Sequence, residues 1–184
     1  YRVDVNSPLE PSSGAFLDDS RLRAIIPTLR TLQNSKVVML GHQSRPGKID
    51  FTNMEQHADR ISRLIGKKVN FISDICGDEA ISSIKNLKIG EMLFLDNIRM
   101  HDDENSMKKA SLEETAQSEI VRKLSSVIDV YVTDAFAASH RNSPSLTGFY
   151  DSVPCIAGHL MSKEISNLQI AVNDPPRPYI AILG

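Results

Sequence analysis

The chain of 184 residues has few cysteines, little net charge and no long apolar run. Its two cysteines, Cys76 and Cys155, are far apart, and its histidines are scattered, so we expect no zinc site. A net charge of −2 argues against a nucleic-acid-binding protein, which usually carries a basic surplus. No apolar run approaches the ~18 residues that span a bilayer, and no signal peptide is recognised. We therefore expect a cytoplasmic protein that binds neither nucleic acid nor a membrane.

Familiar nucleotide-binding and nucleophile motifs are also absent from the sequence. It contains no G-x-x-x-x-G-K-[ST] phosphate loop, no G-x-G-x-x-G after a strand and no G-x-S-x-G elbow. These absences exclude nucleotide binding by a familiar loop and catalysis by an activated serine of the hydrolase type.

Strand-like and helical segments alternate along the chain. Strands are predicted at residues 2–5, 36–40, 69–72, 91–95 and 129–133. Helices are predicted at residues 19–33, 53–65, 79–86, 111–127 and 159–172. Strands that alternate with helices of this length predict an α/β protein with a mainly parallel sheet.

Local signals refine these boundaries. Pro27 predicts a kink or a late start in the first helix. Capping boxes are predicted from Thr52 with Glu55 and from Ser111 with Glu114, and Gly66 is predicted to end a helix. The polar stretch 102–109 is interpreted as a solvated surface loop, and residues 179–183 as a further strand.

Cationic and hydrogen-bonding side chains follow four of the predicted strands. They are Asp4, Asn6, His42, Arg45, Arg99, His140 and Arg141. In an open parallel sheet, ligands bind outside the carboxyl ends of the strands, so these loops should converge on one basic mouth. A basic pocket on a mildly acidic chain indicates a site for a small, multiply charged anion.

Several of the candidate residues also have an ordinary structural explanation. Arg45 could be a solvated arginine, and Arg99 could pair with Asp102 or Asp103. Asp4 and Asn6 could cap the first loop by Asx-type bonds, and Arg21 and Arg23 could lie on a solvated helix face. Structural roles are assigned to His57 on a helix surface, His101 in a loop, His159 at a helix start, and Cys76 and Cys155 in packing.

Six motifs occur in an order and at separations that resemble the phosphoglycerate kinase family. They are RVDVNSP at 2–8, DSR at 19–21, HQSRP at 42–46, LDNIR at 95–99, DAF at 134–136 with HR at 140–141, and IAILG at 180–184. The HQSRP form is similar to archaeal members. The resemblance covers nearly the whole chain.

The resemblance implies a Rossmann-like three-layer α/β sandwich, one of the two domains of the family. Residues 1–157 would form the amino-terminal domain, which binds 3-phosphoglycerate or 1,3-bisphosphoglycerate. Residues 158–173 would form the interdomain helix, and residues 174–184 the first strand of a nucleotide-binding domain whose remainder is missing. Mg²⁺ with ATP or ADP would bind that missing domain, so no cofactor or metal is expected in this chain, which we expect to be a monomer.

The resemblance also implies roles for individual residues. Arg21 would contact the transferred phosphoryl group, and the substrate would be bound by Asp4, Asn6, Arg21, His42, Arg45, Arg99 and Arg141. The chain departs from the family at Asp96, Ala137 and Ser143, where glutamate, glycine and a second histidine are often found; the last change removes one possible cation.

The implied reaction is reversible phosphoryl transfer between 1,3-bisphosphoglycerate with ADP and 3-phosphoglycerate with ATP, in glycolysis and gluconeogenesis. The chain alone would lack activity. The alternative is a non-catalytic α/β module that binds a small anion.

Overall fold

The amino-terminal segment joins two parallel sheets in the computed structural model, which describes residues 1–182. One sheet has the order β1 (Val37–Met39), β3 (Met92–Phe94), β2 (Val69–Phe71), and the other pairs β4 (Tyr131–Thr133) with β5 (Cys155–Ala157). Arg2 bridges Leu40 on one side and Thr133 on the other. The two sheets thus form one parallel layer with the first residues of the chain in its middle.

This central segment is shorter as a strand than the sequence predicts. Only Arg2 makes parallel bridges, supported by hydrogen bonds from Arg2 N to Val132 O at 2.8 Å and from Val3 N to Leu40 O at 2.9 Å. The prediction of a strand over residues 2–5 is therefore right in place and too long, because the backbone of residues 4–5 makes no ladder bonds within the described chain.

Helices cover both faces of the parallel layer. Val37 and Met39 face a core shared with α1 (Ser20–Ala24), α2 (Ile26–Thr31) and α3 (Glu55–Ile65). Val38 and Leu40 face the opposite core, shared with α4 (Asp78–Asn86) and α7 (Glu119–Ser125). Because side chains alternate between the faces of a strand, this pattern places the layer between two sets of helices. The predicted three-layer α/β fold is confirmed.

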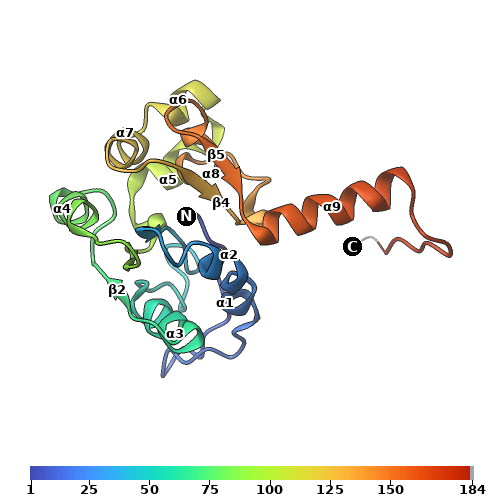
Figure 1. Ribbon diagram of the computed structural model, residues 1–184, viewed down its shortest axis with the longest axis horizontal. Coiled ribbons are helices and arrows are strands. Elements are labelled where there is room, and N and C mark those ends of the chain that lie inside the picture. Colours follow the sequence, from blue (N-terminus) through green and yellow to red (C-terminus); the bar gives the residue numbers. More distant parts are fainter. Residues whose placement is uncertain (183–184) are drawn as a thin grey trace.

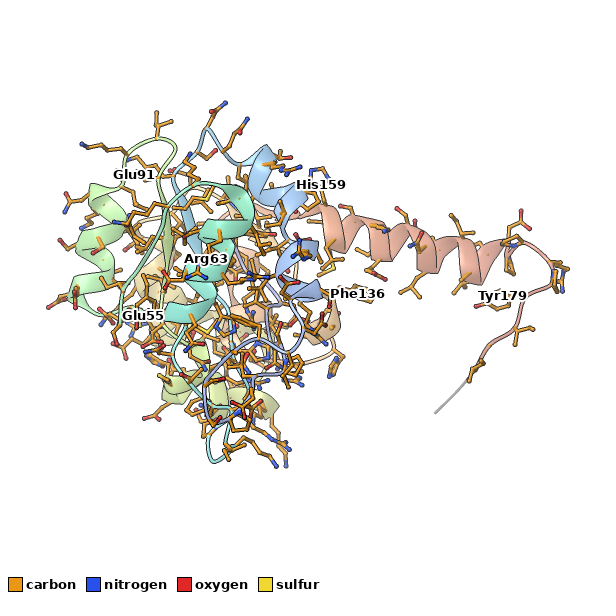
Figure 2. The ribbon with its side chains drawn as sticks, turned by 90° about the horizontal axis from the view of Figure 1, so that it is seen from below. Glu55, Arg63, Glu91, Phe136, His159 and Tyr179 are labelled. Carbon is orange, nitrogen blue, oxygen red and sulfur yellow. The ribbon has the colours of Figure 1, made fainter. Side chains whose placement is uncertain are left out.

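The other elements connect this sandwich or extend from it. The short ones are η1 (Ile98–Met100), α5 (Asp102–Ser106), η2 (Met107–Lys109), α6 (Leu112–Ala116), η3 (Phe136–Ala138), α8 (Pro144–Thr147) and η4 (Gly148–Asp151). The long helix α9 (His159–Asn173) projects away from the body (Figure 1). Figure 2 places His159 beside the body and Tyr179 near the far end of the helix. Among the described residues, no helix is both long and apolar enough to cross a membrane.

Two predicted helices are each broken into two. The predicted helix 19–33 is interrupted at Ile25, because Pro27 occupies the first turn of α2 and cannot continue a preceding helix. The predicted helix 111–127 begins with the expected capping box of Ser111 and Glu114. It stops after Ala116, and Ser118 caps α7 by accepting a hydrogen bond from Val121 N.

The capping box predicted from Thr52 and Glu55 is wrong. Met54 is the N-cap of α3, and Asp96 Oδ1 accepts a hydrogen bond from Met54 N at 3.2 Å. A side chain distant in sequence therefore binds the N-cap amide, and Asn53 Oδ1 accepts a hydrogen bond from Glu55 N at 3.2 Å. At the other end, Gly66 terminates α3 with a φ of 69°, as expected for a left-handed glycine.

The interpretation of residues 102–109 as a solvated loop is wrong. They form α5 and η2, and Glu104 is buried there. Its carboxylate accepts hydrogen bonds from Ser143 Oγ at 2.8 Å and from Ser145 Oγ at 2.7 Å. These long-range contacts explain why a polar stretch folds against the body.

The edge strand β5 has no counterpart among the predicted strands, and Cys155 is exposed on it, so its assignment to packing is wrong. Cys76 is buried, as expected. The predicted strand 179–183 is irregular over residues 179–182, and its last residue lies outside the described residues.

Of the three histidines with an assigned place, only His57 is assigned wrongly, since His101 lies in a bend between η1 and α5, in agreement with its assignment to a loop. His57 is buried under Phe16 rather than on a helix surface. His101 caps α5 by accepting a hydrogen bond from Asp103 N, whereas His159 begins α9 as expected.

Candidate anion-binding site

Loops at the carboxyl ends of the parallel segments surround a cavity of about 840 Å³. Five of the seven residues predicted for the substrate site line it: Asn6, His42, Arg45, Arg99 and Arg141. They follow the amino-terminal segment, β1, β3 and β4 in turn, and η1 and η3 carry the chain away from the last two strands. The parallel topology therefore gathers side chains from four separate stretches of sequence.

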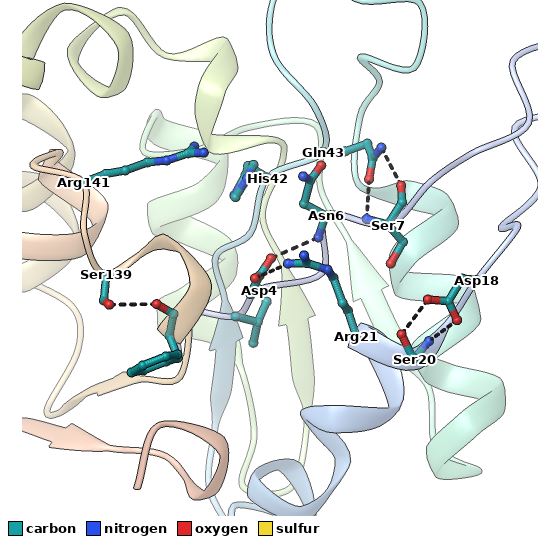
Figure 3. Close-up of polar contacts among 12 residues, drawn as sticks. Asp4, Asn6, Ser7, Asp18, Ser20, Arg21, His42, Gln43, Ser139 and Arg141 are labelled. Atoms are coloured by element: carbon teal, nitrogen blue, oxygen red, sulfur yellow. Dashed lines mark hydrogen bonds and ion pairs between the residues drawn. The ribbon is translucent and has the colours of Figure 1, made fainter. Parts of the chain in front are cut away.

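The remaining two predicted residues, Asp4 and Arg21, form an ion pair and are not among the cavity-lining residues. Figure 3 shows the guanidinium of Arg21, on α1, meeting the Asp4 carboxylate next to Asn6. Asp4 Oδ1 also accepts a hydrogen bond from Asn6 N at 3.4 Å, the Asx-type bond considered from the sequence. Asp4 thus has a structural role in the described chain.

The loop after β1 is held in an unusual backbone conformation at Ser44, whose φ is 56°. Asn6 Oδ1 accepts a hydrogen bond from Ser44 N at 2.7 Å, Ser44 Oγ donates to Asp50 Oδ1 at 2.6 Å, and Arg99 Nη1 donates to Ser44 O. A non-glycine residue in the left-handed region is uncommon and needs such support. These bonds fix the path of the chain into Arg45.

Arg99 does not form the ion pair with Asp102 or Asp103 considered as an alternative; within residues 1–182 its guanidinium bonds Ser44 O. Asp103 instead accepts a hydrogen bond from Glu119 N at 2.8 Å. Arg45 and Arg141 are exposed, and neither forms an ion pair with a carboxylate within the described residues 1–182. Their charges are therefore available to a ligand.

His42 is buried in the cavity wall. Burial, followed by the positive charges of Arg2, Arg141 and Arg21, lowers the pKa of His42 to about 2. Its Nδ1 lies 3.1 Å from Arg2 Nη2. The imidazole is therefore neutral near pH 7 and contributes a hydrogen-bonding group to the site rather than a charge.

Arg2, Lys108 and Glu104 also line the cavity and were not predicted as site residues. A charged residue at the start of an otherwise apolar strand was the available signal for Arg2. Lys108 and Glu104 fall in the stretch interpreted as a loop. Within residues 1–182, the cavity wall therefore carries five fixed cations, Arg2, Arg45, Arg99, Lys108 and Arg141, and the single carboxylate of Glu104.

This arrangement suits a small anion with several charges. Arginine forks pair two oxygens of a carboxylate or phosphate at once, and the neutral imidazole and Asn6 add hydrogen bonds. Ser143, where the family often has histidine, donates its hydroxyl to Glu104 and adds no charge. No group of three metal-ligating side chains occurs among the residues that the structure describes.

Comparisons with known proteins agree with this fold. The family model described as "Phosphoglycerate kinase" matches residues 1–184. Phosphoglycerate kinase from Methanothermus fervidus is 44% identical over 185 residues, covering 100% of this chain and 45% of that protein. The corresponding protein of Archaeoglobus fulgidus is 44% identical over 183 residues, covering 100% of this chain and 44% of that protein.

The chain is also similar to solved structures of phosphoglycerate kinases. The crystal structure of phosphoglycerate kinase from Pyrococcus horikoshii OT3 superposes with a TM-score of 0.91 and 42% identity, covering 96% of this chain and 43% of that chain. The structure from Coxiella burnetii gives a TM-score of 0.74 at 25% identity. The chain spans less than half the length of these relatives. With its whole length matched by the family model, this chain belongs to the phosphoglycerate kinase family.

Proposed function

We propose that this chain is the acceptor-binding half of a phosphoglycerate kinase, which transfers a phosphoryl group between 1,3-bisphosphoglycerate with ADP and 3-phosphoglycerate with ATP. Residues 1–157 would bind the phosphoglycerate and residues 158–173 would lead to a nucleotide domain that begins at 174–184. MgATP or MgADP would bind in the part of the relatives that this chain does not span. The setting would be cytoplasmic glycolysis and gluconeogenesis, with a monomeric enzyme.

The convergence of fixed cations on one cavity carries this proposal. The chain has a net charge of −2, whereas the cavity wall holds five fixed cations against one carboxylate. 3-Phosphoglycerate carries roughly three negative charges near pH 7, from a phosphate monoester and a carboxylate. The local excess of positive charge matches that ligand in sign and approximate magnitude.

For this phosphoryl transfer, the protein needs mainly to align the two substrates and to stabilise the charge of the transferred group. The nucleophile is the carboxylate of 3-phosphoglycerate, which is already ionised, so no general base is needed. A neutral His42 is compatible with this requirement. Closure of a second domain over the site would bring the nucleotide phosphate to the carboxylate and exclude water, the competing acceptor.

Arg21 remains our candidate for contacting the transferred phosphoryl group, because the matching arginine of the family has that role. Its ion pair with Asp4 keeps the guanidinium near Asn6 (Figure 3), and its charge contributes to the lowered pKa of His42. Asp4 would then orient Arg21 as well as approach the substrate.

Calorimetric titration of the chain with 3-phosphoglycerate tests the proposal. Arg45→Ala removes a guanidinium with no hydrogen bond in the described chain, and Arg99→Ala removes one that also supports Ser44. Each should weaken binding by about 2 kcal/mol, roughly thirtyfold, because a charged partner of the anion is lost.

Arg122→Ala is the matched control, since Arg122 is exposed on α7, away from the cavity-lining residues. Its affinity should equal that of the unmodified chain. The assigned site would be refuted if the Arg45→Ala and Arg99→Ala variants bound 3-phosphoglycerate as tightly as the unmodified chain does. It would also be refuted if the unmodified chain gave no heat of binding.

A further inference from the structure

Arg2 is an arginine buried inside the wall of the candidate site. Its side chain is only 1% exposed although it carries a fixed charge. Nε donates to Ser145 Oγ at 3.0 Å, Nη1 donates to Val3 O, and Nη2 lies 3.1 Å from His42 Nδ1. A buried guanidinium is costly unless it is hydrogen-bonded and its charge is balanced, so these contacts require a nearby carboxylate.

Glu104 supplies that carboxylate through Ser145. Ser145 Oγ accepts from Arg2 Nε and donates to Glu104 Oε1 at 2.7 Å, and Ser145 N donates to Glu104 Oε2 at 3.0 Å. Glu104 is 5% exposed, so both charges lie inside the protein. The resulting chain of bonds runs from α5 through α8 to the amino-terminal segment, and ends at His42 beyond β1.

The contact between Arg2 and His42 has only one possible direction. A guanidinium can donate hydrogen bonds but cannot accept them, so Nδ1 of His42 must be the acceptor and carry no proton. In a neutral imidazole the proton is then on Nε2. The charge of Arg2, close to the ring, also disfavours a second proton on Nδ1.

The other ring nitrogen is free to meet a ligand. Within residues 1–182, no hydrogen bond is made by His42 Nε2, and the fully enclosed side-chain atoms without a partner are Ser7 Oγ and His57 Nδ1. His42 Nε2 is therefore not sealed inside the protein. Because His42 lines the cavity, this N–H is a donor toward that cavity.

We infer that Arg2 is a positioning residue for the site, which holds His42 as the neutral Nε2–H tautomer so that the ring donates one hydrogen bond to an oxygen of the bound anion. Ser145 and Glu104 hold Arg2 in turn. The identity of the anion, 3-phosphoglycerate, rests on the proposed function, whereas the tautomer is a property of the chain without ligand.

Nitrogen-15 NMR of the chain labelled at histidine tests the inference, with His42→Gln assigning the resonances. Near pH 7 and without ligand, His42 should show a protonated Nε2 and a bare Nδ1. In Arg2→Met, the Nδ1–H tautomer or the imidazolium should appear, and 3-phosphoglycerate should bind about ten- to a hundredfold more weakly. Arg30→Met, which removes an exposed arginine on α2, should change neither.

A protonated Nδ1 on His42 in the unmodified chain would overturn the inference without any variant. So would an Arg2→Met chain that loses affinity while His42 keeps the original tautomer, because Arg2 would then have only a structural role. If Arg2→Met does not fold, the double variant Arg2→Met with Glu104→Gln removes both buried charges together. The tautomer of His42 and the affinity for 3-phosphoglycerate are then measured in the double variant, with the same expected results. The expected tautomer with no heat from 3-phosphoglycerate would refute the proposed function and support the hydrogen-bond assignment.

Discussion

Individual residues near the site were predictable from sequence when their position along a strand was enough to place them. Arg45, Arg99 and Arg141 follow predicted strands, and parallel topology brings them to one cavity. Arg2 lies within the strand itself and was missed. The burial of His57 could not be predicted either, since it depends on Phe16 and on a 3.1 Å contact with Gln43 Oε1, both from other parts of the chain.

The buried histidines should make the chain less stable in mild acid. Burial lowers the pKa of His57 from 6.5 to about 4, so below pH 6.5 the unfolded chain binds a proton that the folded chain does not. Stability then falls as pH falls, by up to about 1.4 kcal/mol per pH unit for each such histidine. Urea unfolding between about pH 7 and pH 5 should show this slope, and His57→Gln should reduce it. An equal slope in the two proteins would contradict the assignment.

Helices and strands were predicted well where the signal is local. The capping box of Ser111 and the left-handed Gly66 are read within a few residues, and both are as expected. Boundaries failed where a distant side chain decides them, as when Asp96 caps Met54 N. The start of α9 also depends on distant partners: Asp134 Oδ1 accepts from Met161 N at 2.8 Å and Thr28 Oγ1 accepts from His159 N at 2.9 Å.

The N-cap of α9, Gly158, should not tolerate a side chain. A Cβ there would overlap the carboxylate of the buried Asp134, which also accepts hydrogen bonds from Tyr1 and Thr28. Gly158→Ala should therefore lower the free energy of unfolding by about 1–3 kcal/mol, the usual cost of overpacking. It should also speed hydrogen exchange at the Met161 amide. Ala157→Ser, a change at the exposed neighbouring residue, is the control and should leave both unchanged; an unaffected Met161 amide in Gly158→Ala would show that α9 is anchored differently.

At the scale of the whole molecule, the local charge of the cavity is opposite in sign to the net charge of the chain. The net charge is −2, yet the cavity wall gathers five fixed cations. Composition alone indicates a weakly acidic protein, and only the topology reveals a basic site. The family resemblance supplied the candidate ligand, which the bulk charge would not have suggested.

Salt should distinguish the local charge from the total charge. If the affinity for 3-phosphoglycerate depends on attraction to the cations of the cavity wall, raising the ionic strength from about 0.01 M to about 0.15 M should weaken binding several-fold. The reason is that the Debye length shortens from about 30 Å to about 8 Å. If the net negative charge dominated, the same screening would strengthen binding. Calorimetry at constant pH across this range, with sodium chloride as the only variable, decides between the two.

The bridging position of Arg2, between Leu40 and Thr133, has a consequence for how the polypeptide acquires its shape during synthesis. During synthesis, the segment around Arg2 can pair with its first neighbour once Leu40 has been made, but its second neighbour, at Thr133, is made about ninety residues later. At translation rates of roughly 5–20 residues per second, one edge of that segment waits several seconds for its partner. Pairing of the amino-terminal segment with both sheets is thus a late, non-local event, of the kind that slows folding in parallel topologies.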